Sequence, residues 1–557
     1  MKLNLKRTTI IGFAFFAILM LWQVYNTYCP LFLTDLLIAN YGGAPADYSY
    51  IIGIIMAMDN ILALFMLPLF GDLSDKTKSP LGKRMPYIIL GTFLAVVLFP
   101  LIAITFINGK LIWLAIIMGL VLVAMNIYRS PAVALMPDIT PKPLRSKGNA
   151  IINLVGYLGA ITAGALAMIF KVSAGESGRI VNASNFTILA PFIITAVLMV
   201  VALIILIINI KENKLHEELK EEMELGEKMA ETSEAIIEDK PLSKVDKTNL
   251  WVLLISIFLW FFAFNAIETF GSSFGTYYLG ESSGWWGTGV IIMTVCSIIA
   301  FIPAGWISSK LGRKNSVMLG LGLMLLGMII AIFIGKGIPL LYYPCIAIAG
   351  IGWAWINVNS YPMVVELANK ENIGKFTGWY YTASMLAQSI TPICVGLLFN
   401  ILGYNFLFVY SAIFTFVALM VFMLYKTTKQ NLVKAELGND KDEKTLEKTE
   451  EKNEEELAEV KVSKPMAIKK PTATKATKKT ARKTSGAKKT SSSKASTSKA
   501  VANKPSQNAD LEKPAELKKP TAKKVQNSSK TKVASKKNTL EKPKTEIKPP
   551  VQRKTTK

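Results

Sequence analysis

The sequence predicts an all-α membrane protein whose twelve transmembrane helices form two six-helix pseudo-repeats, followed by a disordered C-terminal tail. From Thr8 to about Tyr425, apolar runs of roughly 20 residues follow one another, the length that crosses about 30 Å of hydrocarbon. After Lys426 the chain becomes Lys, Thr, Ser, Ala and Pro with almost no aromatic residues, so it cannot bury enough apolar surface to fold. The formal net charge of +24 therefore comes mostly from the tail.

The apolar runs also set the expected domain boundaries. The first run follows a short basic segment and lacks a small-residue cleavage site, so we interpret it as a helix rather than a removable signal peptide. The predicted spans are 8–36, 49–70, 87–107, 111–136, 148–170, 188–210, 250–275, 285–307, 316–334, 338–364, 376–401 and 406–425. They predict an N-terminal half (1–210), a cytoplasmic inter-half loop (211–249), a C-terminal half (250–425) and a tail (426–557).

Basic residues predict how the helices are oriented. Successive connections fall alternately on two sides of the membrane, and one side carries most of the lysines and arginines. The basic side carries Lys2, Lys6, Arg7, Lys76, Lys78, Lys83, Arg84, Lys142, Arg145, Lys147, Lys310, Arg313, Lys314, Lys370 and Lys375. The other side carries Lys110, Lys171, Arg179 and Lys336. The positive-inside rule predicts a multi-pass cell-membrane protein with both termini in the cytoplasm.

The two halves resemble each other in sequence. The segment Pro131-Ala-Val-Ala-Leu-Met-Pro-Asp138 before Lys147 is similar to Tyr361-Pro-Met-Val-Val-Glu366 before Lys375, with the same acid-to-lysine spacing. Duplicated six-helix halves are typical of transporters that alternate access about a central site. The pattern therefore predicts secondary transport.

Two loop motifs carry a resemblance to a known family. The first is Gly305-x3-Ser309-Lys310-Leu311-Gly312-Arg313-Lys314, which resembles the loop signature of the major facilitator superfamily, although an aspartate is usual where Ser309 stands. The second is Pro68-x2-Gly71-x2-Ser74-Asp75-x-Thr77-x4-Gly82-Lys83-Arg84-Met85-Pro86-Tyr87. This expanded form resembles the glycoside–pentoside–hexuronide:cation symporters and the sucrose–proton symporters of solute carrier family 45. The resemblance implies the major facilitator fold and solute transport.

A third motif bears on the coupling ion. Asn126-x2-Arg129-x-Pro131-x3-Leu135-x-Pro137 has the spacing of the melibiose-permease segment that carries a sugar-binding aspartate, but Arg129 occupies that position here. Leu67 likewise replaces the aspartate that the cation symporters carry before the helix 2 proline. These departures disfavour a sodium site, and the proton-coupled solute carrier 45 branch fits better.

Three ionisable residues lie well inside predicted spans: Asp59, Arg129 and Glu268. Each costs about 2.5–3.5 kcal/mol at mid-bilayer on insertion scales, so such residues are functional candidates by default. A carboxylate in a low-dielectric cavity favours its protonated form, and a movable cation nearby favours its charged form. We therefore expect Asp59 or Glu268 to carry a proton, with Arg129 competing for the acid. The alternative is a static Asp59–Arg129 pair that stabilises the N-terminal half.

Polar and aromatic residues at helical spacing predict a sugar-binding site. Amide and carboxylate groups suit hydroxyls, and flat rings suit the apolar face of a sugar. The candidates are Gln23, Asn26, Asn60, Asn126, Asn153, Tyr157, Asn265, Trp353, Asn357, Tyr381 and Gln388. The alternative for each is a hydrogen bond between packed helices. Trp285 and Trp286, at a span end, are interpreted as interfacial anchors.

The family resemblance implies a cytoplasmic gate. Its predicted elements are Gly71, Asp75, Lys83, Arg84, Gly305, Arg313 and Lys314, which would hold the cytoplasmic face shut when the transporter faces outward. Asp138 and Glu366, at the cytoplasmic ends of helices 4 and 10, are expected to cap or pair with these basic loops.

The expected function is secondary active transport, with proton-coupled symport of a sugar or glycoside by a monomer. Alternatives are an organic-anion or drug exchanger, or a membrane anchor whose basic tail binds anionic lipid or nucleic acid. The four cysteines lack CxxC spacing or a nearby histidine, and the sequence contains no phosphate-binding loop. We therefore expect no enzymatic activity, no cofactor and no metal.

Overall fold

The computed structural model describes residues 2–235, 243–368 and 372–426. Within them, 12 helices are long and apolar enough to cross a membrane, which confirms the predicted fold class. The predicted disordered tail, from residue 427 onward, lies outside the described residues, as do 236–242 of the inter-half loop.

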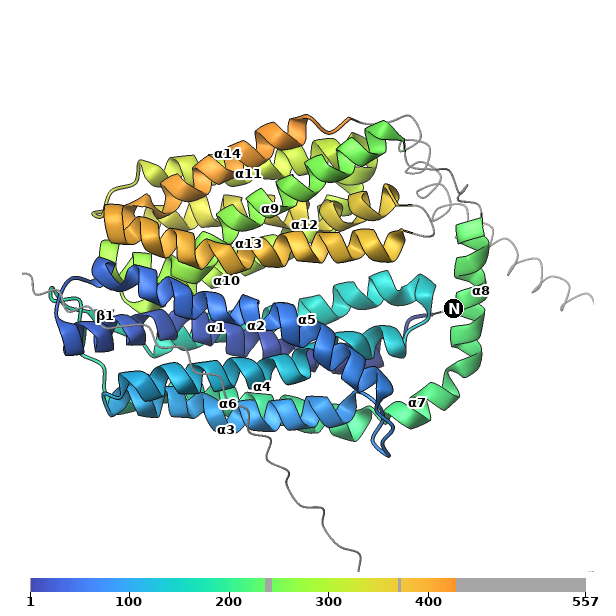
Figure 1. The fold of residues 1–557 in the computed structure, drawn as a ribbon, viewed down its shortest axis with the longest axis horizontal. Helices are drawn as coiled ribbons and strands as arrows, with labels where there is room; N and C mark the ends of the chain where they lie inside the picture. Colours follow the sequence, from blue (N-terminus) through green and yellow to red (C-terminus); the bar gives the residue numbers. More distant parts are fainter. Residues whose placement is uncertain (1, 236–242, 369–371, 427–557) are drawn as a thin grey trace, which may run out of the picture. The chain divides into compact units, whose positions relative to one another are not determined.

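The membrane helices fall into two sets of six, with two shorter helices between them (Figure 1). The first set comprises α1 (Leu5–Tyr41), α2 (Ser49–Lys76), α3 (Met85–Ile107), α4 (Leu111–Asp138), α5 (Arg145–Ile169) and α6 (Asn185–Asn209). The second comprises α9 (Lys244–Ser273), α10 (Ser283–Leu311), α11 (Arg313–Ile332), α12 (Tyr342–Glu366), α13 (Ile373–Leu402) and α14 (Leu407–Met423). Between the sets lie α7 (Glu212–Glu218) and α8 (Lys220–Ala235).

Side-chain caps explain where several helices begin. Asn4, Ser184 and Ser243 each accept a backbone N–H of the first turn of α1, α6 and α9, respectively. Such caps satisfy donors that have no partner within the helix. Because Ser243 provides this cap, α9 begins at Lys244, ahead of the predicted start at 250.

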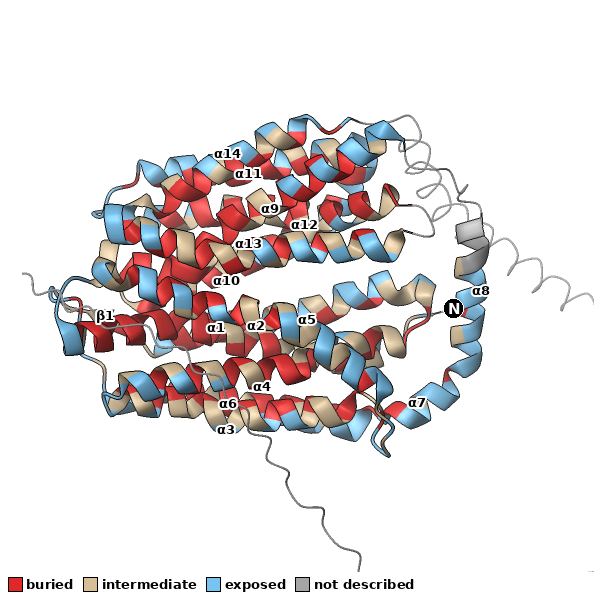
Figure 2. Ribbon diagram, viewed as in Figure 1, coloured by how far each residue is buried: buried red, intermediate tan, exposed pale blue. Residues whose placement is uncertain are grey.

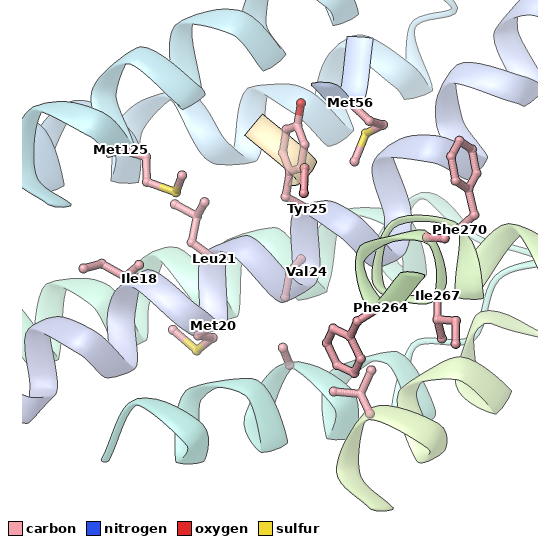
Figure 3. Packing of buried hydrophobic residues seen from close by; sticks show 14 of the residues in the cluster. Ile18, Met20, Leu21, Val24, Tyr25, Met56, Met125, Phe264, Ile267 and Phe270 are labelled. Carbon is pink, nitrogen blue, oxygen red and sulfur yellow. The ribbon is translucent and has the colours of Figure 1, made fainter. Parts of the chain in front are cut away.

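The buried core runs between the helices, and the outward faces of most of them stay exposed (Figure 2). Helix α1 is central: it packs against α5, α6 and α4 of its own half and against α9 of the other half. Figure 3 shows its buried residues lying between Met56 of α2 and Met125 of α4 on one side and Phe264, Ile267 and Phe270 of α9 on the other. Helix α1 therefore joins the packing of both halves.

The halves meet closely at the end of the bundle that carries the short hairpin of β1 (Ser173–Ala174) and β2 (Ile180–Val181) (Figure 1). Gly53 of α2 approaches the Pro392 carbonyl of α13 so closely that an added Cβ would lie 2.1 Å from its oxygen. Asn400 donates to the carbonyl of Asp47 at 2.8 Å, and Tyr404 donates to that of Pro45 at 3.3 Å. Helices α2 and α13 thus close this end through backbone contacts.

Helices α7 and α8 lie at the opposite end, beside the N-terminus (Figure 1). The sequence predicts a helix-prone acidic connection here, and the structure places two helices in its described part. A Cβ added at Gly226 of α8 would lie 2.9 Å from Pro141, which precedes α5. The connection is therefore packed on the N-terminal half at its start.

The interpretation of Trp285 and Trp286 as interfacial anchors is wrong. Their exposed fractions are 4% and 1%, whereas a ring that faces lipid would have a large exposed fraction in the protein alone. The Trp286 ring packs against Gly271 of α9, and the Trp285 indole donates to the Pro339 carbonyl at 3.0 Å. Both rings fill the space between α9, α10 and α12.

Close packing of α5 on α1 depends on a residue without a side chain. A Cβ added at Gly159 would lie 2.2 Å from the Phe16 carbonyl oxygen, whereas one at Gly322 of α11 would meet nothing within 4 Å. We expect Gly159→Ala to lower the free energy of unfolding by about 1–3 kcal/mol through overpacking. Gly322→Ala is the matched control and should be neutral or stabilising, because alanine favours helix. Thermal unfolding in detergent measures both, and equal midpoints would contradict the packing argument.

Candidate functional site

A cavity of about 110 Å³ lies between the two halves. Its lining comes from α1, α5, α9, α10 and α12, so neither half forms it alone. The lining residues are Leu19, Trp22, Gln23, Tyr157, Ala160, Phe264, Glu268, Val290, Met293, Thr294, Ser297 and Trp353. Four of them are aromatic, and Glu268 is the one carboxylate; no lysine or arginine lines the cavity.

The three predicted intramembrane charges lie within electrostatic range of one another. Coulombic interactions join Arg129 with Asp59, and both of them with Glu268. Glu268 lines the cavity, whereas Asp59 is not among the lining residues and is 3% exposed. Neither Asp59 carboxylate oxygen has a hydrogen-bond partner among the described residues. The structure thus brings the charges together but does not form the static Asp59–Arg129 pair of the alternative interpretation.

Arg129 is held by an aromatic ring instead of a carboxylate. Its guanidinium carbon lies 4.6 Å from the centroid of the Trp22 ring, and one guanidinium nitrogen has no hydrogen-bond partner among the described residues. A cation over an indole face gains about 2 kcal/mol or more when water is excluded. Trp22 also lines the cavity, so the half-buried cation contacts a residue of the cavity lining.

Three of the predicted sugar-binding residues line the cavity: Gln23, Tyr157 and Trp353. The Trp353 ring stacks on Phe264 with 3.8 Å between centroids, which leaves a flat aromatic wall. Gln23 is buried and its amide nitrogen has no hydrogen-bond partner among the described residues, so a donor remains free for a ligand.

The other predicted binding residues do not line the cavity. The amides of Asn126, Asn153, Asn357 and Gln388 donate to carbonyls one turn earlier in their own helices. Asn60 donates across the halves to the Gln388 carbonyl at 3.4 Å, and Asn265 lies within hydrogen-bonding distance of Thr269. Asn26 is buried, and Tyr381 is exposed beside the rings of Tyr361 and Tyr380.

Sequence reasoning missed the contribution of α10. Thr294 and Ser297 line the cavity, and Ser297 donates to the Gly350 carbonyl at 2.9 Å. Two hydroxyl residues three positions apart lie on one helix face, which is a signal within an otherwise apolar span. Trp22 directly precedes the predicted binding residue Gln23 in the sequence, but its contact with Arg129 depends on tertiary packing.

The predicted gate residues of the N-terminal half form one ion cluster, at the end of the bundle where the N-terminus lies. Arg84 contacts Asp75 and donates to Asp138 at 2.8 Å. Lys83 lies 3.1 Å from Asp138 and 3.9 Å from Asp75. Arg84 also donates to the Gly71 carbonyl at 3.2 Å, so the motif glycine enters the cluster through its backbone.

The C-terminal half repeats the pattern in simpler form. Arg313 lies 2.5 Å from Glu366, and Lys314 donates to the Met423 carbonyl at 3.5 Å. Gly312 precedes α11 with a φ of +79°, a conformation that favours glycine, and Gly305 has open space around it. Each cluster therefore pairs within its own half, which agrees with the expected pairing of Asp138 and Glu366.

Twelve membrane helices in two sets, with a cavity between them and repeated ion clusters at one end, define a secondary transporter. The sequence matches the Major Facilitator Superfamily over residues 11–356 and 279–483, and the chain belongs to this family. No curated protein matches the sequence.

Solved structures with the same fold include three transporters of low sequence identity. One is a D-xylose–proton symporter, with TM-score 0.57 and 15% identity over 77% of this chain and 98% of that chain. Another is a bacterial homologue of the iron transporter ferroportin in the inward-facing state, with TM-score 0.54 and 13% identity over 77% and 100%. A third is a bacterial homologue of the human lysosomal transporter Spinster, inward-facing and occupied, with TM-score 0.52 and 12% identity over 76% and 96%. At these identities the likeness concerns the fold alone.

The contact between Trp22 and Arg129 gives a test of the site. Trp22→Leu removes the ring beside a half-buried cation, so we expect a loss of about 1–2 kcal/mol in stability. Trp306→Leu is the matched control: Lys310 lies 3.9 Å from its ring centroid, but Trp306 is 61% exposed, so a loss of only about 0.5–1 kcal/mol is expected. Thermal unfolding in detergent measures both, and an equally large loss from Trp22→Leu when Arg129 is replaced by Met would contradict the interaction.

Proposed function

We propose that this chain is a proton-coupled symporter of a sugar or glycoside that works by alternating access. The observation that carries the proposal is Glu268: a carboxylate that lines the inter-half cavity within electrostatic range of Asp59 and Arg129, without a fixed ion pair among the three. Charges inside a membrane bundle are costly and typically mark ion pathways. A set of charges that is close but not paired can change partners when a proton binds.

The three charges would have different roles. Glu268 faces the cavity and would exchange its proton with the solvent that enters with the cargo. Asp59, which is not among the lining residues, would compete with Glu268 for the positive charge of Arg129. Protonation of either carboxylate releases Arg129 toward the other, which links proton binding to the state of the cavity.

The lining of the cavity favours a neutral cargo. Trp22, Tyr157 and the stacked Trp353 supply ring faces, and the free amide of Gln23 supplies a hydrogen-bond donor. An organic anion would need a positive partner, yet Arg129 contacts the Trp22 ring and none of the described residues that line the cavity is basic. These features support a sugar over the organic-anion alternative, and the loop motifs support the solute carrier 45 branch over a sodium symporter.

The ion clusters would form the cytoplasmic gate. The end of the bundle with the N-terminus and both clusters would face the cytoplasm of a cell-membrane carrier, as the positive-inside rule predicts. Asp75, Arg84 and Arg313 pair within their own halves while the opposite end is closed, which supports an inward-facing arrangement. The carrier would act as a monomer, as expected from the sequence.

Proteoliposome counterflow is the direct test of cargo and coupling. Vesicles loaded with one unlabelled disaccharide, monosaccharide or organic acid are diluted into the same labelled compound, with and without an inward pH gradient. We expect counterflow of a labelled sugar in the loaded vesicles without the gradient, and net accumulation of the sugar in unloaded vesicles only with the gradient. Counterflow of organic acids alone would favour the exchanger. Deletion of residues 427–557 should leave the flux unchanged, and flux that depended on the tail would contradict the proposed division of function.

Asp59 should separate coupling from transport. We expect Asp59→Asn to abolish gradient-driven accumulation and to spare exchange at equal concentrations, because the neutral amide can neither attract Arg129 by losing a proton nor release it by binding one. Asp72→Asn is the matched control: this aspartate on the same helix is exposed and pairs with Lys76 one turn away. Unchanged accumulation in Asp59→Asn would remove this residue from the coupling mechanism.

A further inference from the structure

The start of the inter-half segment carries a buried acid that the sequence motifs do not explain. Glu212 is the first residue of α7, follows the end of α6 by three positions, and is 4% exposed. Its carboxylate accepts the backbone N–H groups of Lys83 at 3.0 Å, Arg84 at 2.9 Å and Met85 at 3.1 Å. Glu212 therefore binds backbone N–H groups where the loop of residues 77–84, called here the gate loop, leads into α3.

The position of these N–H donors at the start of α3 explains why they bind a carboxylate. The first N–H groups of a helix have no partner inside the helix, and the positive end of the helix dipole attracts an anion. No side chain of the loop itself caps α3. The Glu212 carboxylate takes this place from another part of the chain, and hydrogen bonds to a charged acceptor are among the stronger ones in proteins.

The backbone conformation of the gate loop accommodates the Glu212 carboxylate. Gly82 has a φ of +108°, and a Cβ added there would lie 2.2 Å from a Glu212 carboxylate oxygen. The next residue, Asn213, donates to the carbonyls of Ser79 at 2.9 Å and Pro80 at 3.0 Å. Two successive residues of α7 thus hold the gate loop from Ser79 to Met85.

Arg84 is consequently held from two sides. Its backbone N–H is bound by Glu212, and its guanidinium group is bound by Asp75 and Asp138. Among the described residues of the C-terminal half, no side chain caps the start of α11 after Gly312, and a Cβ at Gly312 would meet nothing within 4 Å. Within the described ranges, the buried clamp is thus found at the N-terminal cluster.

We propose that Glu212 is a positioning residue of the gate, which fastens the inter-half segment to α3 and so orients Arg84 toward Asp75 and Asp138. The inference rests on the gate role given above, but it does not depend on the identity of the cargo or on proton coupling. It makes the beginning of the inter-half segment part of the N-terminal gate rather than a free connection.

Hydrogen–deuterium exchange of the full chain in detergent tests the local clamp. In Glu212→Ala, the amides of residues 83–85 should exchange at least tenfold faster, because their acceptor is gone. Exchange at the matching residues 313–315 should stay unchanged, and Glu212→Gln should be intermediate, since its amide oxygen still accepts hydrogen bonds without the charge. Glu218→Ala is the matched control, because this exposed acid of the same helix pairs with Lys214. Unchanged exchange at 83–85, or an equal rise at 313–315, would overturn the clamp.

A double-mutant cycle tests whether the clamp acts through Arg84. Thermal midpoints are measured for Glu212→Ala, Asp138→Asn and the double variant. If Glu212 orients Arg84 toward Asp138, the double variant loses clearly less than the sum of the two single losses, because both changes disrupt the same contacts. Fully additive losses would show that Glu212 only stabilises the fold, and would overturn the positioning role while leaving the proposed symport untouched.

Discussion

A charge inside a lipid-embedded bundle gains no compensation from water, and this constraint governs the arrangement around Asp59, Arg129 and Glu268. In membrane proteins such charged groups are commonly paired with one another. Here Arg129 lies over an indole ring, and the Asp59 carboxylate oxygens have no hydrogen-bond partner among the described residues. Under the proposed symport, a proton or a shift of Arg129 would relieve this cost of burial. Aromatic residues of the cavity wall lie beside the charges, so the relief would take place next to the proposed cargo site.

The fold was predictable because hydrocarbon thickness imposes a length on every span. The apolar runs give the helices directly, and the repeated loop motifs reveal the two halves. Errors arose where local pattern and tertiary packing disagree. Trp285 and Trp286 lie at a span end and so resemble lipid anchors, but their rings pack on Gly275, just after α9, and on Gly271 of α9, respectively. Nothing in the local sequence distinguishes these two uses of tryptophan.

The site was predictable in its charges and only partly in its lining. Asp59, Arg129 and Glu268 are conspicuous because polar groups are rare in spans. Asparagine and glutamine in a span do not by themselves indicate a binding site, because their amides can donate to a carbonyl of the same helix. Asn126 and Asn357 do so. Glu212 was not predictable at all: one glutamate in an acidic segment has no distinguishing neighbour, and its partners are backbone groups more than a hundred positions away.

The contacts that join the two halves at the hairpin end differ in kind from the ion clusters at the other end. At the hairpin end, Gly53 and Gly396 bring backbone against backbone, and such contacts carry no net charge. At the other end, ionised side chains face one another, so dissolved salt and anionic headgroups act on them. Under the proposed orientation, the anionic lipids of the inner leaflet would act directly on the ion clusters of the gate. The lipid composition of that leaflet is then a further influence on the gate.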